Sequence, residues 1–277
     1  MSQTHTHHQP FDPLERISGQ LDCGVLFLCD HASNSLPENY GYLGLDPAQF
    51  QRHIAYDIGA AAVTRELARL FSAPALLTRF SRLLIDPNRG ADDPTLVMQL
   101  SDGAIIPGNA RIDAAEIAAR TDLYWRPYRD TTREMIDQMI AKGPVPAIIG
   151  IHSFTPIWKD RPRPWEIGIL WDSDPRLAQP SLASLRRDGT LTIGDNEPYD
   201  GALEGDTMYE HGTKRGLAHM LIEIRQDLID NPQKARDWAE RLAPALREVL
   251  AAPQTHQIEF YQSRAHGRAR FAKGPLT

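Results

Sequence analysis

The sequence predicts an α/β fold: a three-layer arrangement in which a mixed, mostly parallel sheet is flanked by helices. Short, continuous apolar runs alternate along the chain with longer segments whose apolar residues recur at helical spacing. Polar and potentially reactive residues follow directly after the apolar runs, the position at which ligands gather in open α/β sheets.

Four apolar runs are predicted to be strands that are buried on both faces. They cover residues 25–29, 147–151, 167–171 and 220–224. Shorter strands or strand edges are expected at 75–78 and 83–85, before a turn at 86–90.

Three segments show the apolar spacing of helices. The first runs from Asp46-Pro47, an N-cap followed by proline at the first helical position, to residue 71. The second covers 112–142 and should break near Pro127. The third covers 233–251 and should be kinked at Pro244.

The composition is that of a globular protein, with 277 residues of which 42% are hydrophobic and 24% charged. We expect a disordered, His-rich leader over 1–20, a single catalytic domain over 21–255 and a basic extension over 256–277. The net charge of −6 leaves no basic excess for phosphates, so nucleic acid is not an expected partner. No apolar run has the length of a membrane span.

The two cysteines, Cys23 and Cys29, lie in one largely apolar stretch. If this stretch is a strand, their Cα atoms are about 20 Å apart, which is too far for a disulfide. Their spacing does not fit a CxxC metal pair either. Reduced thiols and a cytoplasmic location are therefore expected.

Histidines follow two of the predicted strands, in Asp30-His31 and His152-Ser153, and Asp172 follows a third. Two imidazoles at one sheet edge, with a carboxylate from a neighbouring helix, would leave a fourth coordination position open, as in catalytic zinc sites. Asp57 is the predicted third ligand. The alternative is that His53, one helical turn earlier, binds the metal while Asp57 orients it. A single buried histidine is more often a hydrogen-bonded core residue than a ligand, and the occurrence of two at equivalent strand ends is what favours a metal site.

Glu223 lies inside the fourth apolar run, where a charge is costly unless it is paired or functional. As a general base it would take a proton from metal-bound water and pass it to the leaving amine. The alternative is a structural salt bridge to Arg225 or Lys214.

Arginines cluster with Asn88 in residues 78–89. Guanidinium groups bind carboxylates in a bidentate fork and stabilise oxyanions. We therefore predict that Asn88 and Arg89 bind a substrate carboxylate and that Arg82 polarises the scissile carbonyl. Further candidates for substrate contacts are Arg79, Ser153, Lys214 and Arg215. Structural salt bridges are the alternative role of these cations.

No GxSxG, P-loop or GxGxxG motif is present, so a serine hydrolase, nucleotide hydrolase or dinucleotide-binding enzyme is not indicated.

As a set, these motifs resemble the N-formylglutamate amidohydrolase family over roughly residues 23–230. The resemblance rests on Pro37 and on the segments at 29–34, 56–60, 79–82, 85–89, 151–154 and 222–225, which read CDHASN, YDIGA, RFSR, IDPNR, IHSF and IEIR.

That family is similar in fold to zinc carboxypeptidases and aspartoacylase, with a phosphorylase/hydrolase-like sheet, and in site layout to zinc amidases of cell-wall peptides. The resemblance implies one zinc ion held by His31, Asp57 and His152, with Glu223 as base and Asn88-Arg89 as carboxylate binder. Carboxypeptidases place a glutamate ligand three residues after the first histidine. This chain has Asn34 there, so its carboxylate ligand has to come from elsewhere.

The expected function is hydrolysis of the amide bond in a small anionic N-acyl acidic amino acid, such as N-formylglutamate, by metal-activated water. The alternatives are a zinc peptidase or N-acetylmuramoyl-type amidase, and a catalytically silent metabolite-binding protein of the same fold.

Overall fold

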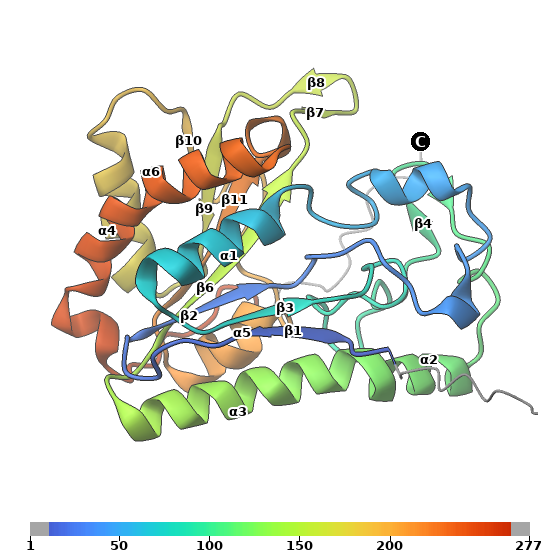
Figure 1. Cartoon of the computed structure of the whole chain (residues 1–277), viewed down its shortest axis with the longest axis horizontal. Helices are drawn as coiled ribbons and strands as arrows, with labels where there is room; N and C mark the ends of the chain where they lie inside the picture. Colours follow the sequence, from blue (N-terminus) through green and yellow to red (C-terminus); the bar gives the residue numbers. More distant parts are fainter. Residues whose placement is uncertain (1–10, 267–277) are drawn as a thin grey trace, which may run out of the picture.

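The computed structural model describes residues 11–266 and centres on a seven-stranded sheet with the order β1-β3-β2-β6-β11-β9-β10 (Figure 1). The strands are β1 (Leu14–Ile17), β2 (Val25–Cys29), β3 (Ala75–Thr78), β6 (Ala147–Phe154), β9 (Ile167–Leu170), β10 (Ile193–Asp195) and β11 (His219–Arg225). The central strands β3, β2, β6 and β11 run parallel, whereas β1 and β9 pair antiparallel with β3 and β11. The predicted mixed, mostly parallel sheet is confirmed.

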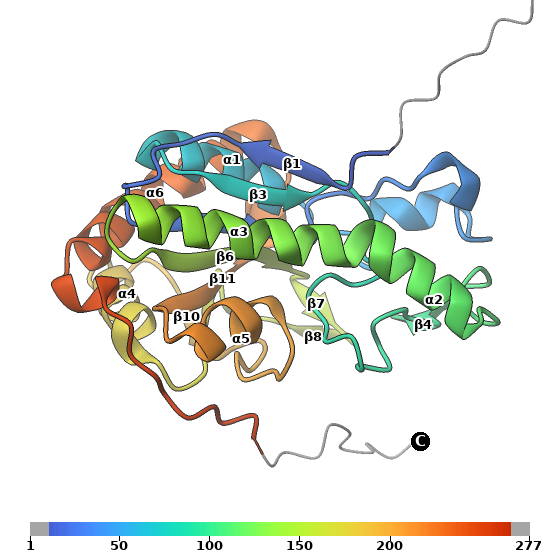
Figure 2. The ribbon, with the colours of Figure 1, turned by 90° about the horizontal axis from the view of Figure 1, so that it is seen from below.

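Helices cover both faces of the sheet (Figures 1 and 2). α1 (Ala60–Phe71), α4 (Pro175–Arg186) and α6 (Pro232–Leu250) pack on one face. α3 (Arg126–Lys142) and α5 (Thr207–His211) pack on the other, with α2 (Ala114–Arg120) and a π-helical turn (Thr121–Trp125) leading into α3.

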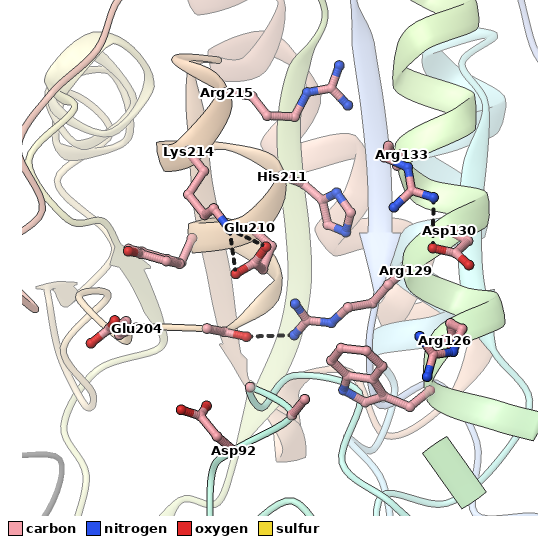
Figure 3. A pocket seen from close by; sticks show the side chains of 15 residues that line it. Asp92, Arg126, Arg129, Asp130, Arg133, Glu204, Glu210, His211, Lys214 and Arg215 are labelled. Carbon is pink, nitrogen blue, oxygen red and sulfur yellow. Dashed lines mark hydrogen bonds and ion pairs between the residues drawn. The ribbon is translucent and has the colours of Figure 1, made fainter. Parts of the chain in front are cut away.

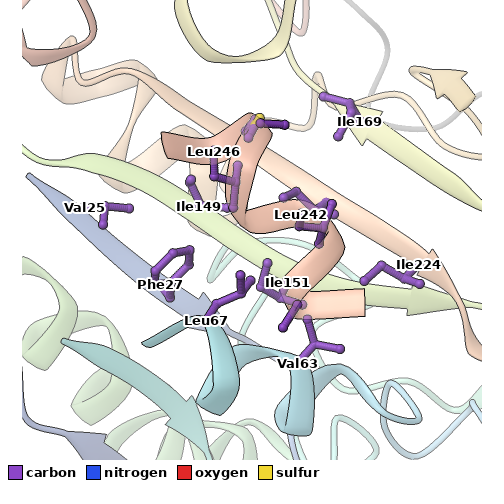
Figure 4. Close-up of a cluster of buried hydrophobic side chains, with 14 of the residues drawn as sticks. Val25, Phe27, Val63, Leu67, Ile149, Ile151, Ile169, Ile224, Leu242 and Leu246 are labelled. Carbon is purple, nitrogen blue, oxygen red and sulfur yellow. The ribbon is translucent and has the colours of Figure 1, made fainter. Parts of the chain in front are cut away.

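The strand side chains alternate between two apolar cores, because successive residues of a strand point to opposite faces. Val25 and Phe27 of β2 join the core under α1 and α6 (Figure 4), whereas Leu26 joins the core under α3. Burial on both faces explains why these strands read as continuous apolar runs. By the same alternation, His152 and Glu223 lie on the α3/α5 face.

Irregular segments overhang the carboxyl ends of β2, β3 and β6 and contain two short hairpins. The hairpins are β4 (Leu100–Ser101) with β5 (Ala104–Ile105), and β7 (Ile157–Trp158) with β8 (Arg161–Pro162). The remaining short helices are η1 (Glu38–Tyr40), η2 (Pro47–Gln51), η4 (Thr213–Arg215), η5 (Gln226–Leu228) and η6 (Pro253–His256).

Two of the predicted elements differ from the structure. The helix expected to run from Asp46 to residue 71 is instead the 3-10 helix η2, a series of turns and then α1, because Gly59 with φ 82° interrupts the helical backbone. Residues 83–85 form no strand: Leu83 and Leu84 lie in a turn and Ile85 is irregular, and their apolar side chains fill small cores of the overhanging segments.

Two further predictions concern the prolines of α3 and α6. The predicted break near Pro127 is present only as a change of helix type: a π-helical turn joins α2 to α3, the backbone stays helical through it, and Pro127 lies in the first turn of α3. The helix α6 runs on through Pro244.

The chain ends differ from expectation where they are described. β1 (Leu14–Ile17) lies inside the expected leader over 1–20, yet it pairs with β3 at the sheet edge and buries Leu14, so these residues belong to the fold. The expected extension over 256–277 packs on the domain up to residue 266, where Arg264 donates to Asp172. Residues 1–10, with their histidines, and 267–277 lie outside the described residues. None of the helices between residues 11 and 266 combines the length and apolar character that a membrane crossing requires.

Candidate metal centre

Three buried side chains converge at the carboxyl ends of β2 and β6. His31 follows β2, His152 lies near the end of β6, and Asp57 lies in the turn before α1. One ligand atom from each lies within 4.8 Å of the others. The structure therefore brings the two imidazoles together, with their ring centroids 5.0 Å apart. This was predicted from their positions at the ends of two strands.

Asp57 lies between the two imidazoles. Its Oδ2 is 2.8 Å from His152 Nδ1 and 3.3 Å from His31 Nδ1. Its backbone N–H donates to His31 O at 2.9 Å, which ties the turn to the end of β2. The carboxylate is therefore presented by a turn and not by the helix that the sequence predicted.

The other ring nitrogen of each imidazole, Nε2, is hydrogen-bonded to a further carboxylate. His31 Nε2 is 2.7 Å from Asp86 Oδ1, and His152 Nε2 is 3.1 Å from Asp30 Oδ2. A neutral imidazole that donates from Nε2 keeps its Nδ1 lone pair for an ion. The candidate ligand atoms are therefore the two Nδ1 atoms and Asp57 Oδ2.

Asp30 and Asp86 are functional candidates that the sequence pattern did not single out. Both lie in the motif segments, Asp30 directly before His31 and Asp86 in the turn that carries Asn88, and both are fully buried. Asp30 also accepts from Thr207 Oγ1 at 2.9 Å. The signal available in the sequence was the presence of these two carboxylates within the motif segments, Asp30 beside His31 and Asp86 beside Asn88 and Arg89.

The electrostatics of the cluster favour a cation. Burial would raise the pKa values of the carboxyls, but the hydrogen bonds and charges of the imidazoles lower the pKa values of Asp30 and Asp57. Arg82 and His31 hold the pKa of Asp86 well below its usual range, against burial. Although burial opposes it, hydrogen bonds to two carboxylates raise the pKa of His152 well above its usual value. These carboxylates stabilise positive charge between them, which a protonated imidazole or a bound divalent ion would supply.

Glu223 lies beside this cluster and forms no ion pair with any residue that the structure describes. In the β6–β11 register it is opposite His152. The side chain is 6% exposed, and its Oε2 has no hydrogen-bond partner within residues 11–266. Burial raises the pKa of Glu223 to about 7, and the charge of Asp57 adds to this effect while that of His152 opposes it. A carboxyl with a pKa near neutrality is suited to accept a proton and return it.

The salt bridges considered for Glu223 are absent from the described part of the chain. Arg225 pairs with Asp227 at 2.9 Å, and Lys214 pairs with Glu210 at 3.0 Å. The unpaired buried carboxylate therefore keeps its predicted role as a candidate base.

The cluster and Glu223 open into a cavity of about 310 Å³, which Arg82, Asn88, Arg89 and Ser153 also line. Arg82 donates to Asp86 Oδ2 at 2.7 Å, and its Nη1 is 3.7 Å from Asp57 Oδ1. Arg89 donates to Thr95 and to the carbonyl of Asn88, and no carboxylate of the described residues pairs with it. Arg89 is therefore a cation available to an anionic ligand.

His53 lines the same cavity but lies outside the group that could hold a metal. Its Nε2 is 3.5 Å from Asp102 Oδ2, and its ring contacts Trp158 of the β7–β8 hairpin edge to face. The rival arrangement, in which Asp57 orients a metal-bound His53, is therefore not the one that the structure forms.

Three other predicted contacts lie away from this cavity. Arg79 is exposed beyond β3 and does not line it. Lys214 and Arg215 line a second cavity of about 520 Å³ between α3 and α5, where Arg215 pairs with Asp137.

Asp172 was expected to share the sheet edge of the histidines, and this expectation is wrong. It follows β9, which runs antiparallel to β11, so that the end of β9 points to the opposite edge. There Asp172 accepts from the backbone N–H of Arg264 at 2.8 Å.

Comparisons with known proteins identify the family and the fold of the chain. A family model described as N-formylglutamate amidohydrolase matches residues 23–230. The crystal structure of a gene product from Agrobacterium tumefaciens has 37% sequence identity and a TM-score of 0.81, covering 87% of this chain and 96% of that one. The crystal structure of N-formylglutamate amidohydrolase from Ralstonia eutropha has 20% identity and a TM-score of 0.66, covering 87% and 98%. No curated protein matches the chain.

Proposed function

The chain belongs to the N-formylglutamate amidohydrolase family, and from this premise we propose that it hydrolyses the amide bond of a small N-acyl acidic amino acid, such as N-formylglutamate, with the help of one metal ion. The observation that carries the proposal is the buried group of His31, Asp57 and His152, with the unpaired Glu223 beside it in one cavity.

The donor set fits zinc. Two imidazole nitrogens and one carboxylate oxygen, with each imidazole backed by a carboxylate, are typical of catalytic zinc sites. When bound there, zinc would supply Lewis-acid polarisation of the amide carbonyl and a more acidic water molecule.

The side chains of this chain would divide the remaining work. Glu223 takes a proton from the attacking water and delivers it to the nitrogen of the breaking C–N bond, so that the free amine and the carboxylic acid leave. Arg82 lies where its guanidinium can stabilise the oxygen that becomes negative. Asn88 and Arg89 bind the carboxylate of the substrate, with Ser153 as a further polar contact.

The proposal is tested by metal analysis together with turnover of N-formylglutamate. We expect about one zinc ion per chain and release of formate and glutamate that a chelator abolishes and zinc restores. Full activity in a metal-free preparation would overturn the metal-dependent mechanism. Turnover of peptides or muramoyl-peptides in place of N-formylglutamate would move the substrate to the alternative class.

We also infer a reducing, cytoplasmic setting. Cys23 and Cys29 are free thiols, which supports this inference. Cys29 is fully buried, and burial raises its pKa well above its usual range, so that it is unsuited to act as a nucleophile.

A further inference from the structure

Arg129 on α3 is a buried arginine that pairs with no carboxylate of the described residues. Within residues 11–266 three arginines are deeply buried: Arg120, Arg129 and Arg176. Arg120 pairs with Glu116 and Arg176 with Asp174, but no ion pair is formed by Arg129 in this part of the chain. Because burial of an unpaired charge is costly, this position calls for a compensating role.

The guanidinium of Arg129 joins two loops through their backbone carbonyls. Its Nη2 donates to Pro87 O at 3.2 Å, to Arg89 O at 3.0 Å and to Gly205 O at 2.7 Å, the last of which Figure 3 shows. The Cζ atom of Arg129 lies 4.5 Å from the centroid of the Trp125 ring, over which the guanidinium stacks. Nε1 of Trp125 donates to the same carbonyl of Arg89. Because Nη2 carries only two hydrogens, one of its N–H groups is shared between two of these carbonyls, and the carbonyl dipoles take the place of a carboxylate partner.

These two loops carry groups that line the metal-site cavity. Asn88 lies between the two held carbonyls of the first loop, and its Oδ1 accepts at 3.0 Å from the backbone N–H of Thr207, the residue at which α5 begins after the second loop. This contact uses the amide oxygen and leaves Nδ2 as a donor for which residues 11–266 offer no acceptor. The side chains of Asn88 and Arg89 reach the cavity, whereas Arg129 does not.

We propose that Arg129 is a positioning residue for substrate binding: it fixes the two loops so that Asn88 and Arg89 present their donors to the substrate carboxylate. The inference rests on the proposed function. Arg129 lies on the far side of the loops, at the wall of the second cavity (Figure 3), and acts on the substrate only through them.

The test compares Arg129→Met, which keeps the bulk of the side chain but removes its donors, with Arg129→Lys. Lysine keeps the charge but has neither the planar fork nor the stacking surface. We expect the KM for N-formylglutamate to rise about 10- to 100-fold in Arg129→Met, because hydrogen bonds to a charged substrate group are weakened. The value of kcat should change by a few-fold at most, and the metal content should stay unchanged. Arg129→Lys should recover part of the loss.

Arg176→Met is the matched control. Arg176 is equally buried and also donates to backbone carbonyls, those of Gly216 and Gln257, but away from the metal-site cavity. It should lower the Tm without raising KM. Arg129 variants that lose stability like the control and keep the wild-type KM would overturn the inference.

Hydrogen exchange separates the inference from the proposed function. Amides of residues 86, 88–90 and 204–207 should exchange faster in both Arg129 variants and at the wild-type rate in Arg176→Met. Unchanged exchange in these loops would overturn the role of Arg129. A wild-type protein that hydrolyses no N-acyl amino acid would instead overturn the proposed function, while the exchange rates still decide whether Arg129 holds the loops.

Discussion

At the scale of single residues, Glu223→Gln tests the chemistry most directly. The amide keeps the size of the side chain but cannot accept a proton. Because general-base catalysis contributes about 10²- to 10⁴-fold, we expect kcat to fall by that factor. Glu223 is not among the residues that could hold the ion, so the metal content should not change. Both quantities are measured on the same preparation, by steady-state kinetics and elemental analysis.

Glu210→Gln is the control for this substitution. Glu210 lines the second cavity and pairs with Lys214, so that its loss should leave kcat unchanged. A Glu223→Gln protein that retains wild-type kcat would show that another group moves the proton.

The buried side chain of His211 should make the stability of the protein depend on pH. Its side chain is buried, and its Nε2 has no hydrogen-bond partner within residues 11–266. Burial, assisted by the charge of Arg129, lowers the pKa of His211 to about 3 from 6.5. As the pH falls below 6.5, His211 therefore becomes protonated in the unfolded chain but stays neutral in the folded protein. The contribution of the neutral His211 to the free energy of unfolding is fully present above this pH. It decreases as the pH falls towards 3, by up to about 1.4 kcal/mol per pH unit.

Urea unfolding of the wild type and of His211→Asn at pH 7.5, 6.0 and 5.0 measures this effect. The asparagine does not titrate, so we expect the stability difference between the two proteins to shift in favour of the variant as the pH falls. Other ionisable groups contribute to both proteins and cancel in the comparison. A difference that is constant across this pH range would contradict the prediction.

At the scale of elements, the turn before α1 determines where Asp57 lies. Gly59 has φ 82°, and a Cβ at this position would lie 2.1 Å from Ile229 O. Gly59→Ala must therefore displace the backbone of the turn and with it the carboxylate of Asp57. We expect a stability loss of more than about 1 kcal/mol and at least tenfold weaker metal binding, measured by thermal unfolding and by competition with a chelator.

Gly189→Ala is the matched control for the turn. Gly189 also has a positive φ, 68°, but a Cβ there meets nothing within 4 Å. Its loss of stability should stay at about 1 kcal/mol, with metal binding unchanged. Equal metal affinity in both variants would mean that the turn does not control the position of Asp57.

The sequence could predict the elements whose pattern depends only on burial. The runs of β2 and β6 are apolar because both of their faces are covered, and their ends place His31 and His152 at one edge. The direction of β9 could not be predicted, because a buried antiparallel strand reads like a buried parallel one. For that reason Asp172 was placed at the wrong edge. The four residues of β1 are too few to show a pattern.

The site itself could be predicted only in part, for a related reason. Residues carried directly by strand ends, such as His152, follow from the fold. Contacts between distant turns do not, because no periodicity relates them. The pairing of His31 with Asp86, 55 residues later in the chain, is such a contact. Lys214 was predicted from its glycine-flanked position, but η4 places it in the second cavity.

At the scale of the whole molecule, metal binding should be linked to folding. Five buried ionisable groups form the centre: Asp30, His31, Asp57, Asp86 and His152. Such a set of ligands exists only in the folded chain, so that the binding energy of the ion adds to the stability of the folded state. The stability of the protein should therefore depend on the free metal concentration.

Thermal unfolding of chelator-treated protein in a zinc titration measures this linkage. At a free zinc concentration of 100 times Kd the stabilisation is about 2.7 kcal/mol, which corresponds to a rise in Tm of about 5–10 °C for a domain of this size. His152→Asn should abolish the shift because it removes a ligand, whereas Glu223→Gln should keep it. The same titration therefore distinguishes the groups that hold the ion from the group that moves the proton. A shift that survives His152→Asn but is lost in Glu223→Gln would reverse the two roles, since the carboxylate in β11 would then be the ligand.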